Sequence, residues 1–401
     1  MNDTLHGKCV LIYSHDSFGL GHLRRCRTIA HALVDGFAGL KVLIVSGSPI
    51  IGSFDFKSRV DFVRVPGVVK LRGGDYTPLS DHIDLSQTLQ LRSSIMEQAA
   101  RTFSPDLFIV DKEPLGLRGE VTETLKTLRR QGVPTVLGLR DILDDSVLLN
   151  KEWEHRGTPR NLEAWYDEIW VFGSPSMGNP LAGIGVSEAA LERLVYTGYL
   201  RRAVPSIAKA PVGLPAEPFI LVTPGGGGDG ETLVDWVLSA LEKKPRPTKP
   251  MVIVLGPFMP QAVRYELQIR AARLKRVQTI TFDANMELLV ERAAGVVAMG
   301  GYNTFCEILS LDKPALLIPR STPRMEQTLR AHRAASLGYI SMLDGDGDRS
   351  ADAMAQALRR LEHQPLPSAA GADKVLSGLE VICERTSRLL SEKNLGHQDI
   401  A

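Results

Sequence analysis

The chain is poor in cysteine, and the spacing of the few cysteines argues against a zinc site and against a disulfide framework. Its 401 residues contain four of them, scattered along the sequence without any Cys-x-x-Cys pair. This spacing matches no zinc-ligand pattern and is typical of reduced thiols rather than of a disulfide framework. We therefore expect a reducing compartment, no metal site and no bound cofactor.

Long apolar runs and an excess of one charge are also missing. No apolar run approaches the roughly 18 residues that a membrane span requires, and no signal-peptide pattern precedes the first apolar run. The sequence thus predicts a cytoplasmic protein, which is compatible with a peripheral contact at the inner face of a membrane. The formal net charge is +1, without the basic bias typical of nucleic-acid-binding proteins. No nucleic-acid partner is expected.

The chain does contain an alternation of short apolar runs with helical patterns, and this alternation occurs twice. Runs such as 8–13 and 106–110 are typical of strands buried in a parallel sheet. The segment 203–218 holds four prolines and little periodicity, and the alternation restarts at 219–223. Strands separated by helices indicate parallel sheets with right-handed crossovers.

The predicted fold class is therefore α/β, with two Rossmann-like domains whose parallel sheets face a central cleft. The first domain is expected over 1–202, the linker over 203–218 and the second domain over 219–401. A last helix is predicted over 370–395 and could pack back on the first domain. Ligands of open α/β sheets bind beyond the carboxyl ends of the strands, so the loops at these ends are the candidate sites.

The first such loop contains the candidate catalytic base. Gly21 and His22 follow the first predicted strand and open a helix. An imidazole has an unperturbed pKa of about 6.5 and could remove a proton from a hydroxyl or from water; the alternative is a histidine that only packs within the turn. His15, Asp16 and Gly21 are further candidates on the acceptor side. Asp16 either orients a histidine or is simply a turn residue.

Two other features of the first half leave alternatives open. Arg25 either meets an acidic or phosphate group or is solvated. Asp111-Lys112-Glu113 follows another predicted strand, and either lines the acceptor side or forms a salt-linked turn.

A glycine-rich loop follows the first predicted strand of the second half. Its members are Gly225, Gly226, Gly227 and Gly228. Backbone N–H groups without side chains beside them can approach a diphosphate, so the loop is a candidate phosphate cradle, the alternative being a flexible turn. Asp229 is predicted to be the N-cap of the next helix.

Three further strand-end segments of the second half carry candidate donor-binding residues. Gly300 and Gly301 turn into a helix that contains Asn303, Thr304 and Glu307. The helix N-terminus suits a diphosphate, and Glu307 could bind two vicinal hydroxyls or merely favour the positive helix end.

The other two segments carry Glu326 with Gln327, which could hydrogen-bond sugar hydroxyls or form a polar first turn, and Phe282 with Met286. Phe282 could frame a nucleobase or belong to the core.

At these loops the sequence resembles the GT-B glycosyltransferases related to the bacterial GlcNAc transferase that completes the peptidoglycan lipid precursor. The resemblance is clearest over 219–337, at the glycine-rich loop, at 299–307 and at 326–327. It implies a nucleoside-diphosphate sugar as donor, UDP-sugar first, with Glu307 on the ribose and Gln327 on the donor sugar. By the same resemblance the histidine of the first loop acts in catalysis.

The first loop departs from the family, which usually reads Gly-Gly-His, whereas this chain reads Gly19-Leu20-Gly21-His22. This form is also similar to the nucleotide-sugar hydrolase of pseudaminic acid biosynthesis. We therefore expect an inverting, metal-independent glycosyltransferase with an unidentified acceptor. A nucleotide-sugar hydrolase, an epimerase and a non-catalytic nucleotide-sugar sensor remain as alternatives.

Overall fold

The computed structural model describes residues 5–15, 21–70, 76–80, 82–206, 211–226, 228–243, 249–347 and 349–395. Asp16 and Gly227 lie outside these ranges. The chain forms two compact units. The first takes in the chain up to Leu200 and from Ser377 on, and the second runs from Arg201 to Leu376.

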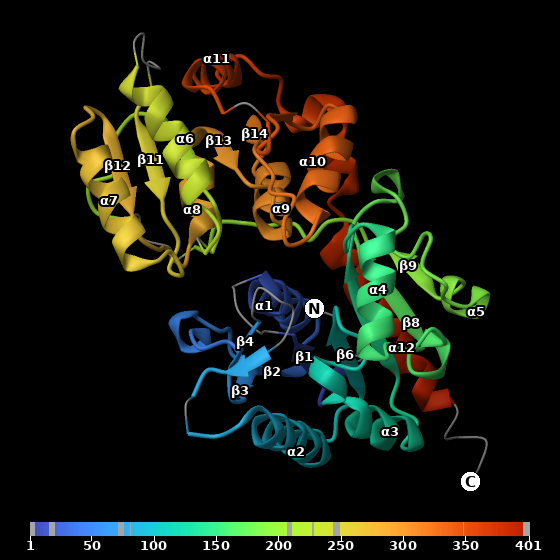
Figure 1. The fold of residues 1–401 in the computed structure, drawn as a ribbon. Helices are drawn as coiled ribbons and strands as arrows, with labels where there is room; N and C mark the ends of the chain where they lie inside the picture. Colours follow the sequence, from blue (N-terminus) through green and yellow to red (C-terminus); the bar gives the residue numbers. More distant parts are fainter. Residues whose placement is uncertain are drawn as a thin grey trace. The chain divides into compact units, whose positions relative to one another are not determined.

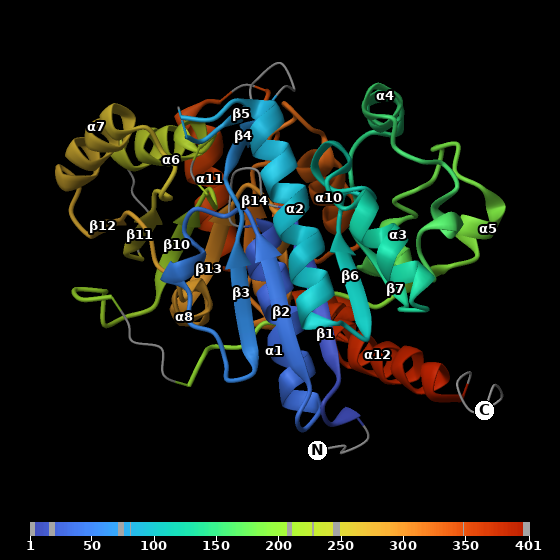
Figure 2. The same cartoon turned by 90° about the horizontal axis from the view of Figure 1, so that it is seen from below.

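The first unit is built on a seven-stranded parallel sheet (Figures 1 and 2). Its order is β3-β2-β1-β6-β7-β8-β9. The strands are β1 (Cys9–Ser14), β2 (Lys41–Ser46), β3 (Val60–Arg64), β6 (Leu107–Asp111), β7 (Thr135–Arg140), β8 (Glu168–Phe172) and β9 (Leu194–Tyr196). A separate antiparallel pair consists of β4 (Val68–Lys70) and β5 (Tyr76–Pro78).

Helices cover both faces of this sheet. They are α1 (Gly21–Gly36), α2 (Leu85–Phe103), α3 (Thr122–Arg130), α4 (Ser146–Arg156), α5 (Glu188–Leu191) and α12 (Gly378–Leu395). Figure 1 shows α1 on one face and α2 and α3 on the other. The apolar side chains of α2 and α3, such as Met96 and Leu125, join those of β1 and β6 in one buried cluster.

The last helix, α12, belongs to the first unit although it ends the chain. It packs against α1, and Arg385 on it forms an ion pair with the buried Glu168 of β8. At its start, Gly378 donates a hydrogen bond to the carbonyl of Tyr199 at 3.0 Å. A Cβ at this glycine would lie 2.6 Å from that carbonyl oxygen, so the close approach requires glycine.

The second unit repeats the parallel design with six strands (Figure 2). The order is β12-β11-β10-β13-β14-β15. The strands are β10 (Phe219–Thr223), β11 (Met251–Val254), β12 (Val277–Ile280), β13 (Ala293–Ala298), β14 (Ala315–Leu317) and β15 (Ser341–Met342). The helices are α6 (Glu231–Glu242), α7 (Gln261–Ala272), α8 (Met286–Arg292), α9 (Tyr302–Ser310), α10 (Glu326–Ser336) and α11 (Ala351–Leu361). Side chains of α6, α7 and α11, such as Val234, Leu267 and Leu358, form the buried core on one face.

The predicted α/β class with two parallel sheets is confirmed, and the predicted start of the last helix was wrong. The last helix was expected from Ala370, but α12 begins at Gly378, and short 3-10 turns occupy 367–370 and 372–375. Among the described residues, no helix is both long and apolar enough to cross a membrane.

Candidate functional site

Each sheet reverses its strand order at one place, and the candidate loops gather at these two switch points. In the first unit the order turns between β1 and β6, and in the second between β10 and β13. At such a switch point the loops beyond adjacent strands diverge to opposite sides and leave a crevice where ligands bind. The loop after β1 leads to His22 and the end of β6 is Asp111, whereas β10 leads to the glycine-rich loop and β13 to Gly300-Gly301.

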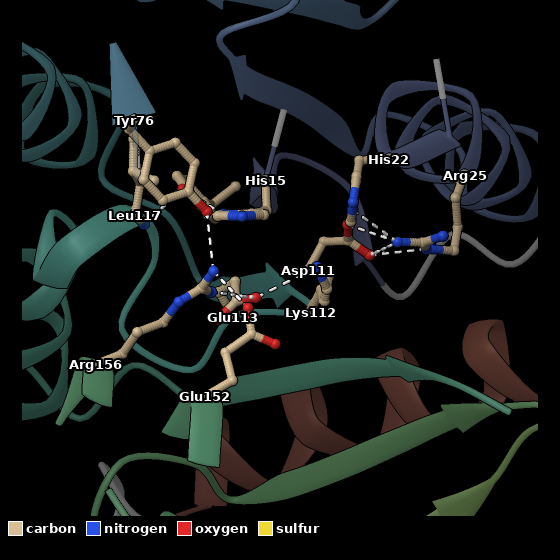
Figure 3. Close-up of polar contacts among 11 residues, drawn as sticks. His15, His22, Arg25, Tyr76, Asp111, Lys112, Glu113, Leu117, Glu152 and Arg156 are labelled. Atoms are coloured by element: carbon tan, nitrogen blue, oxygen red, sulfur yellow. Dashed lines mark hydrogen bonds and ion pairs between the residues drawn. The ribbon is translucent and has the colours of Figure 1, made fainter. Parts of the chain in front are cut away.

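His22, Asp111 and Arg25 form one polar group at the first switch point (Figure 3). The Nδ1 atom of His22 lies 2.5 Å from Oδ2 of Asp111. Arg25 donates through Nε to Oδ1 at 2.8 Å and through Nη2 to Oδ2 at 2.7 Å. The side chains of Arg25 and Asp111 are only 2% and 3% exposed, so this ion pair is part of the core, whereas His22 at 19% reaches the surface.

This arrangement determines which nitrogen of His22 carries the proton. An ionised carboxylate only accepts hydrogen bonds, so Nδ1 must be the protonated nitrogen and donate to Asp111. Arg25 Nη2 also lies 3.0 Å from Nδ1, and since both are donors, Arg25 bonds to the shared carboxylate and not to the ring. The lone pair of Nε2 is then available to accept a proton.

The electrostatics keep this histidine neutral and the aspartate charged. Burial and the cationic Arg25 lower the pKa of His22 to about 4, against the opposing effect of Asp111. Burial alone would raise the pKa of Asp111, but Arg25 and His22 hold it well below its usual range. At neutral pH the group therefore consists of a neutral imidazole, a carboxylate and a guanidinium, which is the protonation state that a general base requires.

His15 lies next to His22 and is held by a second buried network. The two rings meet edge to face with centroids 5.6 Å apart. Tyr13 donates its hydroxyl to Glu120 at 2.5 Å, and Arg92 grips both oxygens of Glu120. The Tyr13 oxygen therefore accepts from Nδ1 of His15 at 3.2 Å, which leaves Nε2 without a proton in this ring as well. Burial lowers the pKa of His15 well below its ordinary value.

A tight turn separates Asp111 from a second charged group. The N–H of Glu113 donates to the carbonyl of Asp111 at 3.0 Å, and Lys112 between them has a φ of 73°. This geometry is a γ-turn with positive φ, which is rare and strained for a residue with a side chain. The turn directs Asp111 toward His22 and Glu113 toward Arg156 (Figure 3).

Arg156 is the centre of that second group. Its Nη1 lies 3.0 Å from Glu113, and its Nη2 lies 2.5 Å from Glu152 and 3.1 Å from the hydroxyl of Tyr76. The guanidinium also lies over the Tyr76 ring at 5.8 Å. These side chains come from the turn after β6, from α4 and from β5, and they place polar groups beside the two histidines.

In the second unit, the predicted cradle consists of bare backbone at two strand ends. A Cβ added at Gly225 or at Gly301 would meet no atom within 4 Å, so both face open space. Gly300 has a φ of 83°, and its carbonyl accepts a hydrogen bond from the fully buried Arg330 at 3.1 Å. The backbone at Gly225 and Gly301 is thus accessible to a ligand, and Arg330 holds the turn at Gly300 in place. The other described glycines of the glycine-rich loop after β10 are Gly226 and Gly228, and both lie in the turn that Gly225 begins.

The helix α9 begins directly after this turn, with Gly301 as its N-cap. Asn303 on it accepts a hydrogen bond from the buried Arg202 at 2.7 Å, Thr304 is half-buried, and the side chain of Glu307 is fully buried. That these residues contact a nucleotide sugar stays a prediction.

The remaining donor candidates lie at neighbouring strand ends. Gln327 opens α10, and its Oε1 accepts from the backbone N–H of Arg320 at 3.4 Å. Glu326 and Met286 are buried, and Phe282 is half-buried just before α8. Within the described ranges, no group of three or more His, Cys, Asp or Glu side chains is placed to hold a metal ion.

The structure corrects one prediction for this region. Asp229 is not the N-cap of α6, because Gly230 occupies that position without a side-chain cap. The carboxylate of Asp229 forms an ion pair with Arg320 instead.

Sequence reasoning missed the partner of His22. The loop residue Asp16 was a candidate to orient a histidine, but the structure places Asp111 on Nδ1 of His22. Arg25, for which solvation was the alternative, is buried against this aspartate. The only signal in the sequence was an aspartate at the end of an apolar run, and its neighbour in the sheet could not be read from it.

Part of the chain is similar in sequence to known glycosyltransferases. Residues 219–385 match the glycosyltransferase family 28 C-terminal domain. Two curated relatives are both described as UDP-N-acetylglucosamine--N-acetylmuramyl-(pentapeptide) pyrophosphoryl-undecaprenol N-acetylglucosamine transferase. That of Methylorubrum extorquens (strain PA1) is 29% identical over 160 residues, 39% of this chain and 43% of the relative. That of Rhodococcus opacus (strain B4) is 26% identical over 193 residues, 47% of this chain and 49% of the relative. The chain thus spans about half the length of the curated relatives it matches.

Solved structures resemble the whole chain at low identity. The spinosyn forosaminyltransferase SpnP has a TM-score of 0.63 and 17% identity, with 96% of this chain and 99% of that chain covered. MurG of Acinetobacter baumannii has a TM-score of 0.55 and 13% identity, with 96% and 99% covered. At such identities the likeness concerns the fold alone. The chain therefore has the GT-B fold, and its residues 219–385 match the model of the glycosyltransferase family 28 C-terminal domain.

Proposed function

We propose that this protein is an inverting glycosyltransferase that needs no metal ion. It transfers a sugar from a nucleoside-diphosphate sugar, UDP-sugar first, to an acceptor hydroxyl. The family 28 match of the second unit supports the donor class. The observation that carries the proposal is the His22–Asp111 contact, because it leaves a neutral imidazole with a free lone pair on Nε2 at a sheet's switch point.

In the proposed reaction, Nε2 of His22 takes the proton of the acceptor hydroxyl while that oxygen attacks the anomeric carbon of the donor sugar. The bond from this carbon to the diphosphate oxygen breaks at the same time, so the anomeric configuration inverts and the nucleoside diphosphate leaves. Asp111 holds the ring in the required tautomer and stabilises the imidazolium that forms. The bare amides at Gly225 and Gly301 and the N-terminus of α9 stabilise the negative charge of the departing diphosphate.

The curated relatives are named for an acceptor that carries pyrophosphoryl-undecaprenol, and we propose a lipid-linked acceptor of this kind for the present protein. A lipid-linked acceptor would bring the enzyme into peripheral contact with the inner face of a membrane. The acceptor would bind on the first unit, beside His15, Glu113 and Arg156. The arrangement of polar side chains there supports an acceptor with hydroxyl or charged groups near the reacting oxygen.

The test is to compare wild type with His22→Ala. A thermal-shift screen tests UDP, GDP and dTDP one at a time. We expect UDP to raise the melting temperature of both proteins by similar amounts. Turnover of the UDP-sugar should fall at least about 100-fold in the variant, because general-base catalysis contributes roughly 10²–10⁴-fold. Undiminished turnover in His22→Ala would refute the assigned role.

The pair of His22 and Asp111, which we call the dyad, could also activate water in place of an acceptor hydroxyl. The Gly21-His22-x-x-Arg25 pattern likewise fits a nucleotide-sugar hydrolase. Mass spectrometry of the products separates the two reactions. Free sugar that forms at full rate without any acceptor would indicate hydrolysis, a changed sugar stereochemistry would indicate epimerisation, and binding without turnover across the donor panel would indicate a sensor.

A further inference from the structure

One ion pair of the second unit joins two loops of the candidate donor site. Asp229 belongs to the glycine-rich loop after β10, and Arg320 follows β14. The Nε atom of Arg320 contacts Oδ2 of Asp229. Neither residue has a role in the function proposed above.

The sheet topology brings the two loops of this pair to the same edge of the sheet as the predicted diphosphate cradle. Strand β13 pairs with β10 on one side and with β14 on the other. All three strands are parallel, so their following loops leave the same edge of the sheet. The loops of β10 and β14 therefore start about 10 Å apart, on either side of the end of β13, and the ion pair joins them. That end is the Gly300-Gly301 turn, where α9 begins.

The turn at the end of β13, between these two loops, suits an anion. Gly301 caps α9 and would accept a Cβ without meeting any atom within 4 Å. The backbone amides at this helix end carry the positive end of the helix dipole. Arg320, in the loop that follows the neighbouring strand β14, adds a cation at this edge of the sheet.

We propose that Arg320 is a diphosphate-binding residue and that Asp229 is its counter-ion only while the donor is absent. The inference rests on the proposed function, since it assigns a residue to the phosphates of the proposed donor. When the nucleoside diphosphate binds, its phosphate oxygens replace the carboxylate of Asp229 on the guanidinium. Arg320 then neutralises the charge that develops on the leaving diphosphate.

Exposure and geometry favour this exchange. The side chain of Asp229 is 48% exposed and that of Arg320 is 23% exposed. Ion pairs at such exposure contribute little to stability, so the pair is easily broken. A planar guanidinium matches phosphate oxygens with two parallel hydrogen bonds, which are stronger than most neutral hydrogen bonds.

Arg320 has contacts other than that with Asp229, one of the guanidinium and one of the backbone. Its Nη1 donates to the carbonyl of Thr322 at 3.3 Å, and its own carbonyl accepts from the hydroxyl of Thr328 at 3.1 Å. Removal of the carboxylate should therefore leave the guanidinium in place and available. This gives the two members of the pair opposite expected effects on ligand binding.

The experiment measures the binding of UDP and of uridine by calorimetry to the full chain and to three variants. Arg320→Ala should weaken UDP binding roughly 10- to 100-fold, as expected for lost hydrogen bonds to a charged group, and leave uridine binding unchanged. Asp229→Asn should bind UDP as tightly as wild type or more tightly. Arg333→Ala removes an exposed cation of α10 and serves as the matched charge control, with no expected effect.

If the ion pair serves only to hold the two loops together, the expected results differ. In that case Asp229→Asn would weaken UDP binding as much as Arg320→Ala does, and that result would overturn the proposal, as would unchanged UDP binding in Arg320→Ala. Thermal unfolding without ligand verifies that the variants are folded, and Arg320→Lys should retain part of the affinity. If wild type binds none of UDP, GDP and dTDP, the donor assignment itself fails, which is a different outcome from these.

Discussion

Asp111→Asn is the substitution that tests the dyad most directly. An asparagine at this position has one acceptor oxygen for two donors, Nδ1 of His22 and the guanidinium of Arg25. Its amide N–H group, turned toward Nδ1, would favour the tautomer that carries the proton on Nε2. That tautomer cannot accept the proton of the acceptor hydroxyl. We therefore expect kcat to fall by roughly 10²–10⁴-fold, the usual contribution of a general base.

The same substitution also destabilises the fold, and its cost can be worked from the geometry. Arg25 contacts both oxygens of Asp111, and the two side chains are 2% and 3% exposed. Removal of one member of such a pair leaves a buried charge without compensation and costs about 3–5 kcal/mol. This is a large part of the roughly 5–15 kcal/mol that stabilises a folded protein. Urea denaturation should detect it.

A double variant separates folding from catalysis. Arg25→Met with Asp111→Asn removes both charges, and the methionine would lie near the Phe172 ring that Arg25 now covers at 5.9 Å. Replacing both members of a buried pair is often nearly neutral for stability, so the free energy of unfolding should recover most of the loss. Catalysis should not recover, because His22 still lacks its carboxylate. If turnover returns together with stability, Asp111 serves the fold alone and the assigned dyad is wrong.

Three further predictions concern protonation and the glycine cradle. Burial and Arg25 hold the pKa of His22 at about 4, so the pH profile of kcat/KM should stay flat well below pH 6.5 and fall only near pH 4; a midpoint near 6.5 would contradict the geometry. The unfolded state takes up this proton below pH 6.5 whereas the folded state does not. The free energy of unfolding should therefore decrease by about 1.4 kcal/mol per pH unit toward pH 4 on this account, and His22→Gln should reduce the slope in urea titrations at pH 7 and 5. Gly301→Ala fits its φ of −59° and open surroundings, so stability should change by less than about 0.5 kcal/mol while UDP binding weakens; Gly300→Ala, at a φ of 83° and 3.1 Å from Leu317, should cost about 1–3 kcal/mol in unfolding experiments.

The sequence contains most of the fold because buried parallel strands leave a strong local signal. Runs such as Phe219–Thr223 are buried throughout and apolar up to the final threonine, and the glycine turns that follow them mark the strand ends. Helix α4 was not predicted, because its apolar residues do not lie on one face. Leu149 and Trp153 are buried, whereas Val147 and Leu148 are 58% and 44% exposed. Its capping residues, Asp145 and Gly157, were the readable signal.

The site is less readable than the fold because its residues come together through strand order. His22 could be selected from the sequence, since a glycine turn between a strand and a helix is a local pattern. Its partner lies 89 positions away and is adjacent only because β1 pairs with β6 in the sheet. Glu113 and Arg156 meet in the same way, from the end of β6 and the end of α4. Side chains that meet through non-local pairing leave no mark in the spacing of residues.

The turn at Lys112 shows how the two groups of the first unit depend on one another. A positive φ at a lysine costs about 1–3 kcal/mol and persists only where its surroundings impose it. Here the residue before it is held by Arg25 and the residue after it by Arg156, each in an ion pair of 3.0 Å or less. The two carboxylates are therefore fixed on opposite sides of a single strained residue. A relaxed backbone at this position would rotate either Asp111 away from His22 or Glu113 away from Arg156. The orientation of the base and the position of the polar group beside it are consequently set by the same peptide units, which couples the proposed base to the proposed acceptor surface.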